Sequence, residues 1–238
     1  MNSQSPFANI PPVVKNLLII NIIFFIGSLT LEKFIPDVFK YLPVYYFNSP
    51  NFRLWEVITY MFMHGGFTHI FFNMFALFSF GPIVEYSMGS KRFLNFYFIC
   101  GIGAIVFQTL VQAYEVHAIT GAFTISHPGL PESFAAYGDQ GQKLAEIYYV
   151  PIVGASGAIF GLLIAFGMLF PNMELMIMFI PIPIKAKYII PVYVVIELFL
   201  GVKQFSGDSV AHFAHLGGAL IGYIMVKYWR LQRPNNFY

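Results

Sequence analysis

The hydrophobic positions of the chain gather into six runs, which are separated by segments rich in charges, prolines and glycines. The runs are between 15 and 22 residues long, close to the roughly 17 to 25 residues that a helix needs to cross a bilayer. The pattern therefore predicts an all-α, polytopic membrane protein with a bundle of six transmembrane helices. We expect spans at about 16–31, 67–84, 93–114, 155–170, 188–202 and 210–228, in a single domain (13–230) between short tails at 1–12 and 231–238.

The segments between these runs differ in composition. Residues 32–66 mix charges, prolines and aromatic residues, which is typical of an element that lies on the membrane surface. Residues 115–153 contain glycines, prolines and four acidic residues, so we expect a long aqueous loop. We expect a surface connection at 173–187, and Ser206 or Asp208 is placed to cap the last helix.

Composition supports a membrane protein and excludes several classes of function. Hydrophobic residues make up 58% of the chain and charged residues 10%, and the mean hydropathy is +0.68. Soluble domains, with about a quarter of their residues charged, do not reach such values. The net charge of +2 provides no basic patch for a nucleic-acid partner. The single cysteine, Cys100, excludes an internal disulfide and a cysteine-rich metal site.

The distribution of basic residues predicts the orientation. Six spans place both termini on one side of the membrane, and 8 of the 13 lysine and arginine residues fall on that side. By the positive-inside rule, we expect the termini to be cytoplasmic. The first apolar run is followed by Glu32 and Lys33 and not by a small-residue cleavage site, so we expect it to remain as a membrane anchor.

A serine lies between glycines at the start of the fourth predicted span. Gly154 and Gly157 leave no side chain beside Ser156, and Gly157 with Gly161 forms a G-x-x-x-G ridge where another helix can approach closely. On its own such a serine is commonly a packing residue, because its hydroxyl can bond to a carbonyl one turn earlier. This span is only ~24 Å long against a hydrocarbon thickness of ~30 Å. We therefore expect Ser156 to lie below the membrane surface.

The sixth predicted span carries a matching stripe. His215, Gly218 and Gly222 stand at i, i+3 and i+7 of a helix, and the two glycines form a second G-x-x-x-G ridge. If the two ridges pack together, the imidazole can meet the Ser156 hydroxyl and act as its general base. His212 is the competing candidate for this role, but only His215 stands three residues before a ridge glycine.

A second polar pair begins the second predicted span. His69 and Asn73 are four residues apart, so both side chains project from one helix face at about the depth expected of Ser156. Acyl transfer needs hydrogen-bond donors where the oxyanion develops, and one donor contributes ~2.7 to 4 kcal/mol. His69, Asn73 and the backbone N–H of Ser156 could form this oxyanion hole. The alternative is that the pair only forms hydrogen bonds that hold neighbouring helices together.

These residues resemble the motifs of the rhomboid intramembrane serine proteases, in the same order and from about Phe52 to the sixth span. The resemblance implies that Ser156 is the nucleophile and His215 the general base, in a dyad without an aspartate. It also implies that His69, Asn73 and the Ser156 amide hold the oxyanion. The matching motifs are Gly154–Gly157, Ala214 with His215 and Gly218, the segment from His64 to Asn73, and Gly81 with Glu85 and Gly89.

The resemblance extends to supporting residues, substrate and location. It places His64 near the water-facing rim and gives Gly154, Gly157 and Gly218 supporting roles. It implies partners that are membrane-spanning proteins, cut near the outer end of a transmembrane segment that enters from the bilayer. No metal or other cofactor is implied. For a bacterial member with this six-span core, the expected location is the cytoplasmic (inner) membrane.

The sequence leaves other functions open. A catalytically inactive rhomboid-like protein that binds transmembrane helices would have the same spans, but such proteins usually lack the serine or the histidine. A haem or transition-metal protein would use the histidines, which show no ligand pattern across facing helices. Glu197 is costly within a span and has no assignable partner. The natural substrate, its cleavage site, the oligomeric state and the role of 115–153 are also left open.

Overall fold

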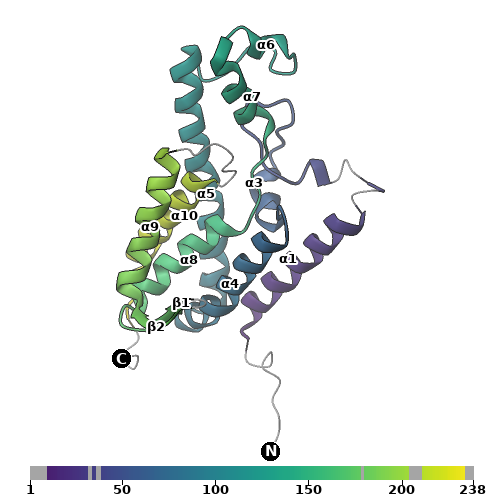
Figure 1. The fold of residues 1–238 in the computed structure, drawn as a ribbon. Coiled ribbons are helices and arrows are strands. Elements are labelled where there is room, and N and C mark those ends of the chain that lie inside the picture. Colours follow the sequence, from purple (N-terminus) through teal and green to yellow (C-terminus); the bar gives the residue numbers. More distant parts are fainter. Residues whose placement is uncertain (1–9, 32–33, 36–38, 178–179, 204–210, 234–238) are drawn as a thin grey trace, which may run out of the picture.

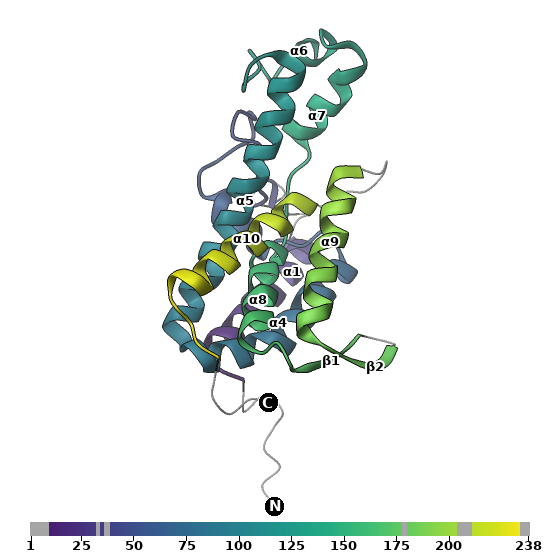
Figure 2. The same cartoon turned by 90° about the vertical axis from the view of Figure 1, so that its left-hand side faces the viewer.

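The described residues of the chain, seen in a computed structural model, form a bundle of six long helices (Figure 1). The structure describes residues 10–31, 34–35, 39–177, 180–203 and 211–233. Successive long helices run in opposite directions, so α1 begins and α10 ends at the same end of the bundle (Figures 1 and 2). These helices are α1 (Pro12–Leu31), α4 (Phe67–Met88), α5 (Ser90–Thr120), α8 (Ser156–Leu169), α9 (Ala186–Lys203) and α10 (His212–Tyr228).

The outer surface of the bundle suits lipid. Of the described helices, α1, α4 and α5 are long and apolar enough to cross a membrane. Large apolar side chains point away from the bundle, among them Ile23, Phe71 and Leu110, which are all more than half exposed. A continuous apolar surface of this kind is unfavourable in water and favourable in a bilayer. The fold is therefore that of an all-α, multi-pass membrane protein, as composition and periodicity predict.

The centre of the bundle is α8, which packs against α4, α5, α9 and α10. Nine of its fourteen residues are buried, as expected for a helix that is apolar on every side. Glycines bring it into backbone contact with α10, because Gly218 lies against Gly157 and Gly222 against Gly161. A Cβ added to Gly222 would lie 2.6 Å from the Cα of Gly161, a separation that real side chains essentially never show. The two glycine ridges therefore meet.

The start of α1 is fixed by a residue of α4. This helix begins at Pro12, earlier than the predicted Asn16. The backbone N–H groups of Val13 and Val14 donate to the two carboxylate oxygens of Glu85, at 3.1 and 2.8 Å. Since the first N–H groups of a helix have no partner within it, a carboxylate at that position stabilises the helix. Glu85 is 1% exposed and ties α1 to the end of α4.

The segment 115–153, for which we expected a loop, contains several helical elements. They stand at the end of the bundle opposite the start of α1 (Figure 1). The glycines and prolines of this segment obscured the helical spacing of Leu144, Ile147 and Tyr148, which face a small apolar core of their own. The elements are the end of α5, α6 (Glu132–Ala135), the 3₁₀ helix η3 (Gly138–Gln140) and α7 (Gly141–Tyr149). The core is formed by Tyr46, Val116, Ile125, Phe134, Leu144, Ile147 and Tyr148.

Two other connections also contain regular structure. The described part of 32–66 is not confined to a surface, because Tyr60 and Met61 are buried against the bundle. The predicted capping residues Ser206 and Asp208 lie outside the described residues. The elements of these connections are α3 (Glu56–Thr59), the 3₁₀ helix η2 (Tyr60–Phe62) and an antiparallel hairpin of β1 (Glu174–Ile177) and β2 (Ile180–Lys185) before α9.

Candidate active site

Ser156 is the first residue of α8, and the backbone that precedes it is held by the first long connection. Val44 and Ile152 exchange two backbone hydrogen bonds, of 3.0 and 2.8 Å. The N–H of Gly154 donates to the carbonyl of Tyr60 at 2.9 Å. Gly154 has a φ of +128°, a conformation that favours glycine. These contacts fix the direction in which the chain enters α8.

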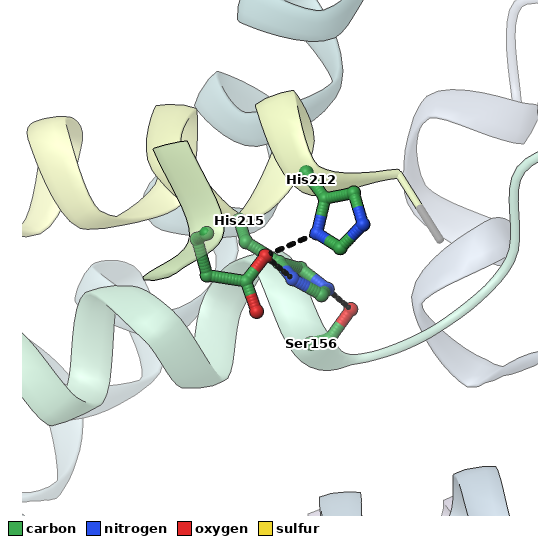
Figure 3. Close-up of polar contacts among 4 residues, drawn as sticks. Ser156, His212 and His215 are labelled. Atoms are coloured by element: carbon green, nitrogen blue, oxygen red, sulfur yellow. Dashed lines mark hydrogen bonds and ion pairs between the residues drawn. The ribbon is translucent and has the colours of Figure 1, made fainter. Parts of the chain in front are cut away.

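The hydroxyl of Ser156 faces the imidazole of His215 (Figure 3). Its Oγ lies 2.8 Å from Nε2 of His215, which is a hydrogen-bond distance. The approach is possible because each residue sits next to the glycine contact between its helix and the other, near Gly157 in α8 and Gly218 in α10. The structure thus brings together the two residues singled out in the sequence, although 59 positions separate them.

Phe160 restricts the plane of the His215 ring. It lies one turn after Ser156 in α8, and its ring stacks on the imidazole with centroids 4.4 Å apart and planes at 8°. Tyr193 of α9 stacks on the same phenylalanine, with centroids 5.8 Å apart. Stacking of this kind fixes the plane of the imidazole, in which Nε2 is directed at Ser156. Nothing in the sequence singles out Phe160, since it is one of 28 phenylalanines.

Glu197, which had no assignable partner in the sequence, joins this group. Its Oε2 lies 2.9 Å from Nδ1 of His215 and 2.7 Å from Nδ1 of His212. An ionised carboxylate only accepts hydrogen bonds, so each imidazole carries a proton on Nδ1. That leaves Nε2 of His215 free of a proton and able to accept the hydrogen of the Ser156 hydroxyl. The bond to Ser156 is therefore made by His215, while His212, the competing candidate, contacts Glu197.

His69 lies beside the same serine. A Cβ added to Gly154 would lie 2.7 Å from Nε2 of His69 and 3.4 Å from Oγ of Ser156, so the two side chains flank that glycine. Nδ1 of His69 accepts the backbone N–H of Gly65 at 3.3 Å. In a neutral imidazole this places the proton on Nε2. His69 therefore presents an N–H donor next to Ser156.

Asn73 and the start of α8 also carry hydrogen-bond donors. Asn73 follows His69 by one turn of α4 and is buried, and its Nδ2 has no hydrogen-bond partner among the described residues. The backbone N–H of Ser156 belongs to the first turn of α8, where N–H groups have no acceptor within the helix. Buried donors without acceptors are costly in a resting protein. They are the groups that an oxyanion hole requires.

His64 is buried rather than placed at an open rim. It is 7% exposed, its ring meets that of His69 edge-on with centroids 5.1 Å apart, and neither ring nitrogen has a partner among the described residues. Burial, with His69 as the second cause, lowers the pKa of His64 to about 4. The ring is therefore neutral at neutral pH. It lines a cavity of about 320 Å³ with residues of α1 such as Phe25 and Ser28.

Glu197, His212 and His215 also carry atom types that bind transition metals. Their ligand atoms lie within 4.8 Å of one another, a grouping identified among the described residues. The short distances within the group are those of hydrogen bonds, and Nε2 of His215 is engaged by Ser156. A metal on Nδ1 of His215 would displace the proton that selects this tautomer. Metal binding there and the bond to Ser156 through Nε2 therefore require different arrangements of the protons.

Comparison with known proteins identifies relatives of the chain. The rhomboid domain family matches residues 51–231. An uncharacterized mitochondrial rhomboid protein of Schizosaccharomyces pombe is 27% identical over 202 residues, which are 75% of this chain and 51% of the relative. Rhomboid protein 1, mitochondrial, of Saccharomyces cerevisiae is 26% identical over 174 residues, 70% of this chain and 39% of the relative. Rhomboid protease AarA of Providencia stuartii is 29% identical over 181 residues, 71% of this chain and 53% of the relative.

The extent of these matches decides what they show. The chain spans about half the length of the curated relatives it matches, such as the 51% and 53% covered in two of them. The family match, in contrast, covers more than two thirds of this chain and includes Ser156, His215, His69 and Asn73. The chain belongs to the rhomboid family.

Proposed function

We propose that this chain is an intramembrane serine endopeptidase that cleaves transmembrane segments of other membrane proteins. The proposal rests on the 2.8 Å contact between Oγ of Ser156 and Nε2 of His215 inside an apolar bundle. A serine hydroxyl is a weak nucleophile unless an adjacent base accepts its proton. The name of a relative, Rhomboid protease AarA, supports the same class of activity.

In the proposed reaction, His215 transfers protons between the Ser156 hydroxyl, the leaving nitrogen and water. Its Nε2 accepts the hydroxyl proton as Oγ of Ser156 attacks the carbonyl carbon of the scissile peptide. The carbonyl oxygen becomes an oxyanion, which receives hydrogen bonds from Nε2–H of His69, the Nδ2 amide of Asn73 and the N–H of Ser156. His215 then gives its proton to the leaving nitrogen as the C–N bond breaks. A water molecule then gives a proton to Nε2 of His215 and attacks the ester carbon, and His215 passes this proton to Oγ of Ser156 as the C–O bond breaks. This releases the carboxylic acid and restores the hydroxyl.

The depth of Ser156 supports a substrate that spans the membrane. With fourteen residues, α8 is about 21 Å long, shorter than the ~30 Å hydrocarbon core. A helix of this length cannot reach both membrane surfaces. If the end of α8 lies at one interface, Ser156 at its start therefore lies within the membrane. An apolar segment of another protein can reach such a site through lipid, but it must unwind there to present a carbonyl group.

We further propose that all six long helices cross the membrane and that both termini face the cytoplasm. The excess of lysine and arginine on the terminal side, 8 of 13, supports this orientation. A bacterial inner membrane is the proposed location, since AarA comes from a bacterium, whereas the names of the yeast relatives place those proteins in mitochondria. Labelling of a cysteine introduced near each terminus, from either side of intact membranes, tests the orientation.

Cleavage of a single-span reporter protein in liposomes tests the proposed activity. We expect Ser156→Ala to abolish cleavage, because the alanine offers no nucleophile. Ser28→Ala is the matched control, since Ser28 is a membrane serine whose hydroxyl donates to Phe25 of its own helix, and it should keep full activity. Cleavage by Ser156→Ala would exclude the proposed serine protease. A folded wild type that fails to react with a fluorophosphonate probe would favour a non-catalytic protein that binds transmembrane helices.

A further inference from the structure

Glu197 is a buried carboxylate that takes no part in the proton transfers of the proposed reaction. It lies in the body of α9 and is 8% exposed. An ionised group inside a membrane protein is costly unless it is paired, and such groups commonly serve function. Among the described residues, its Oε2 has two imidazole partners at hydrogen-bond distance, on His215 and His212.

We propose that Glu197 is a positioning residue that extends the serine–histidine pair to a Ser156–His215–Glu197 triad, with His212 holding the carboxylate from its other side. This inference rests on the protease function proposed above. It departs from the expected dyad without an acidic residue. The three side chains come from α8, α10 and α9, and the two contacts of 2.8 and 2.9 Å connect them in a line through the imidazole.

The carboxylate has two effects on His215. First, accepting the Nδ1 proton selects the tautomer in which Nε2 is a base, and it fixes the ring in the orientation that Phe160 also favours. Second, when His215 takes the proton of Ser156 it becomes a cation next to an anion. Because both side chains are largely buried, this interaction is stronger than in bulk solvent. The first effect populates the reactive tautomer and the second stabilises the transition state, so both should appear in kcat.

His212 and Gly201 explain how the carboxylate keeps its place. His212 donates from Nδ1 to the same Oε2 that His215 contacts, so the oxygen is held from two directions. Gly201 follows Glu197 by one helical turn, and a Cβ added there would lie 3.2 Å from the Cβ of His212. The glycine thus lets α9 approach the start of α10 closely. We therefore expect His212 to act through Glu197 and not on the substrate.

Two Glu→Gln substitutions separate positioning from structural support. Glu197→Gln removes the charge and keeps the side chain's shape, and we expect kcat for a single-span reporter to fall ~100-fold or more with KM nearly unchanged. Glu85→Gln is the matched control, because Glu85 is also a buried glutamate of the bundle. It binds the start of α1 near the C-terminal end of α4, away from His69. The control substitution should lower the melting temperature and leave kcat close to wild type. Glu197→Asp, which keeps the charge, should recover part of the lost kcat.

Other results separate a failure of the positioning role from a failure of the protease function. If Ser156→Ala is inactive but Glu197→Gln retains wild-type kcat, the protease remains and the positioning role is wrong. If Glu197→Gln lowers kcat only in proportion to its loss of folded protein, the residue is structural and the proposal fails. If EDTA abolishes wild-type activity and zinc restores it, the three side chains hold a metal and the positioning role is wrong. Cleavage by Ser156→Ala would overturn the protease itself.

Discussion

Gly218 of α10 lies so close to the backbone of Gly157 in α8 that a Cβ on Gly218 would overlap the Gly157 carbonyl group. Gly218→Ala must therefore push the two helices apart. We expect this variant to melt at a lower temperature and to lose cleavage by ~100-fold or more, because it separates the Ser156 hydroxyl from the His215 imidazole. Gly129→Ala, at a position with nothing within 4 Å of the new Cβ, should change neither property. Wild-type cleavage by Gly218→Ala would show that the ridge contact is not needed.

Asn73 should contribute to the rate and little to substrate binding. Asn73→Ala removes a buried Nδ2 donor that has no partner among the described residues. We expect kcat to fall ~100-fold with KM nearly constant, since the donor is used only when the oxyanion develops. The control is Asn21→Ala, because Asn21 is a buried amide that donates to Leu17 in its own helix. If Asn73→Ala alters only stability, as Asn21→Ala should, the pair with His69 only holds neighbouring helices together.

Acidification should stop the reaction. A protonated His215 cannot accept the hydrogen of Ser156, so cleavage should decline on acidification, measured over a range of about pH 8 to about pH 5. Among the described residues, Glu197 lies at hydrogen-bond distance from this imidazole and His212 contacts the same carboxylate. His69 flanks Ser156, and Phe160 covers the ring face. The rate of reporter cleavage, measured in one detergent at constant ionic strength, checks the decline. A flat profile across this range contradicts a histidine base.

His64 should make the stability of the protein sensitive to acid. Its pKa in the folded protein is lowered to about 4 by burial, while an exposed histidine titrates near ~6.5. Between these values the unfolded chain binds the additional proton, so the free energy of unfolding falls as the pH falls, by up to about 3 kcal/mol. We expect His64→Phe to show a weaker dependence of melting temperature on pH between ~6.5 and ~4 than wild type. Parallel curves for the two proteins would contradict burial of a neutral ring.

The contact between Ser156 and His215 could be predicted because its pattern is local. Each of the two helices carries glycines four residues apart, and such spacing marks the face on which a helix meets another. The polar residue next to each ridge is then directed to the same place. The helical lengths of these segments also follow from their apolar runs.

The carboxylates could not be assigned in the same way. Glu197 contacts a histidine 18 positions later, and Glu85 binds backbone groups 71 positions earlier. Neither partner has a spacing that periodicity reveals, because each lies on a different helix. The cost of burying Glu197 in a span indicated that a partner exists, but only the packing of α9 on α10 identifies it.

The hydrogen bonds from Gly154 to Tyr60 and between Val44 and Ile152 give the first long connection a share in the proposed catalysis. The start of α8, with the proposed nucleophile Ser156, is hydrogen-bonded to a segment about a hundred residues earlier. A hybrid that exchanges this segment with that of another rhomboid must therefore preserve both sets of hydrogen bonds. Exchange of α8 and α10 alone would transfer Ser156 and His215 without the hydrogen bonds that hold the start of α8. Differences in cleavage rate between such hybrids would then reflect how well the donor segment holds the start of α8.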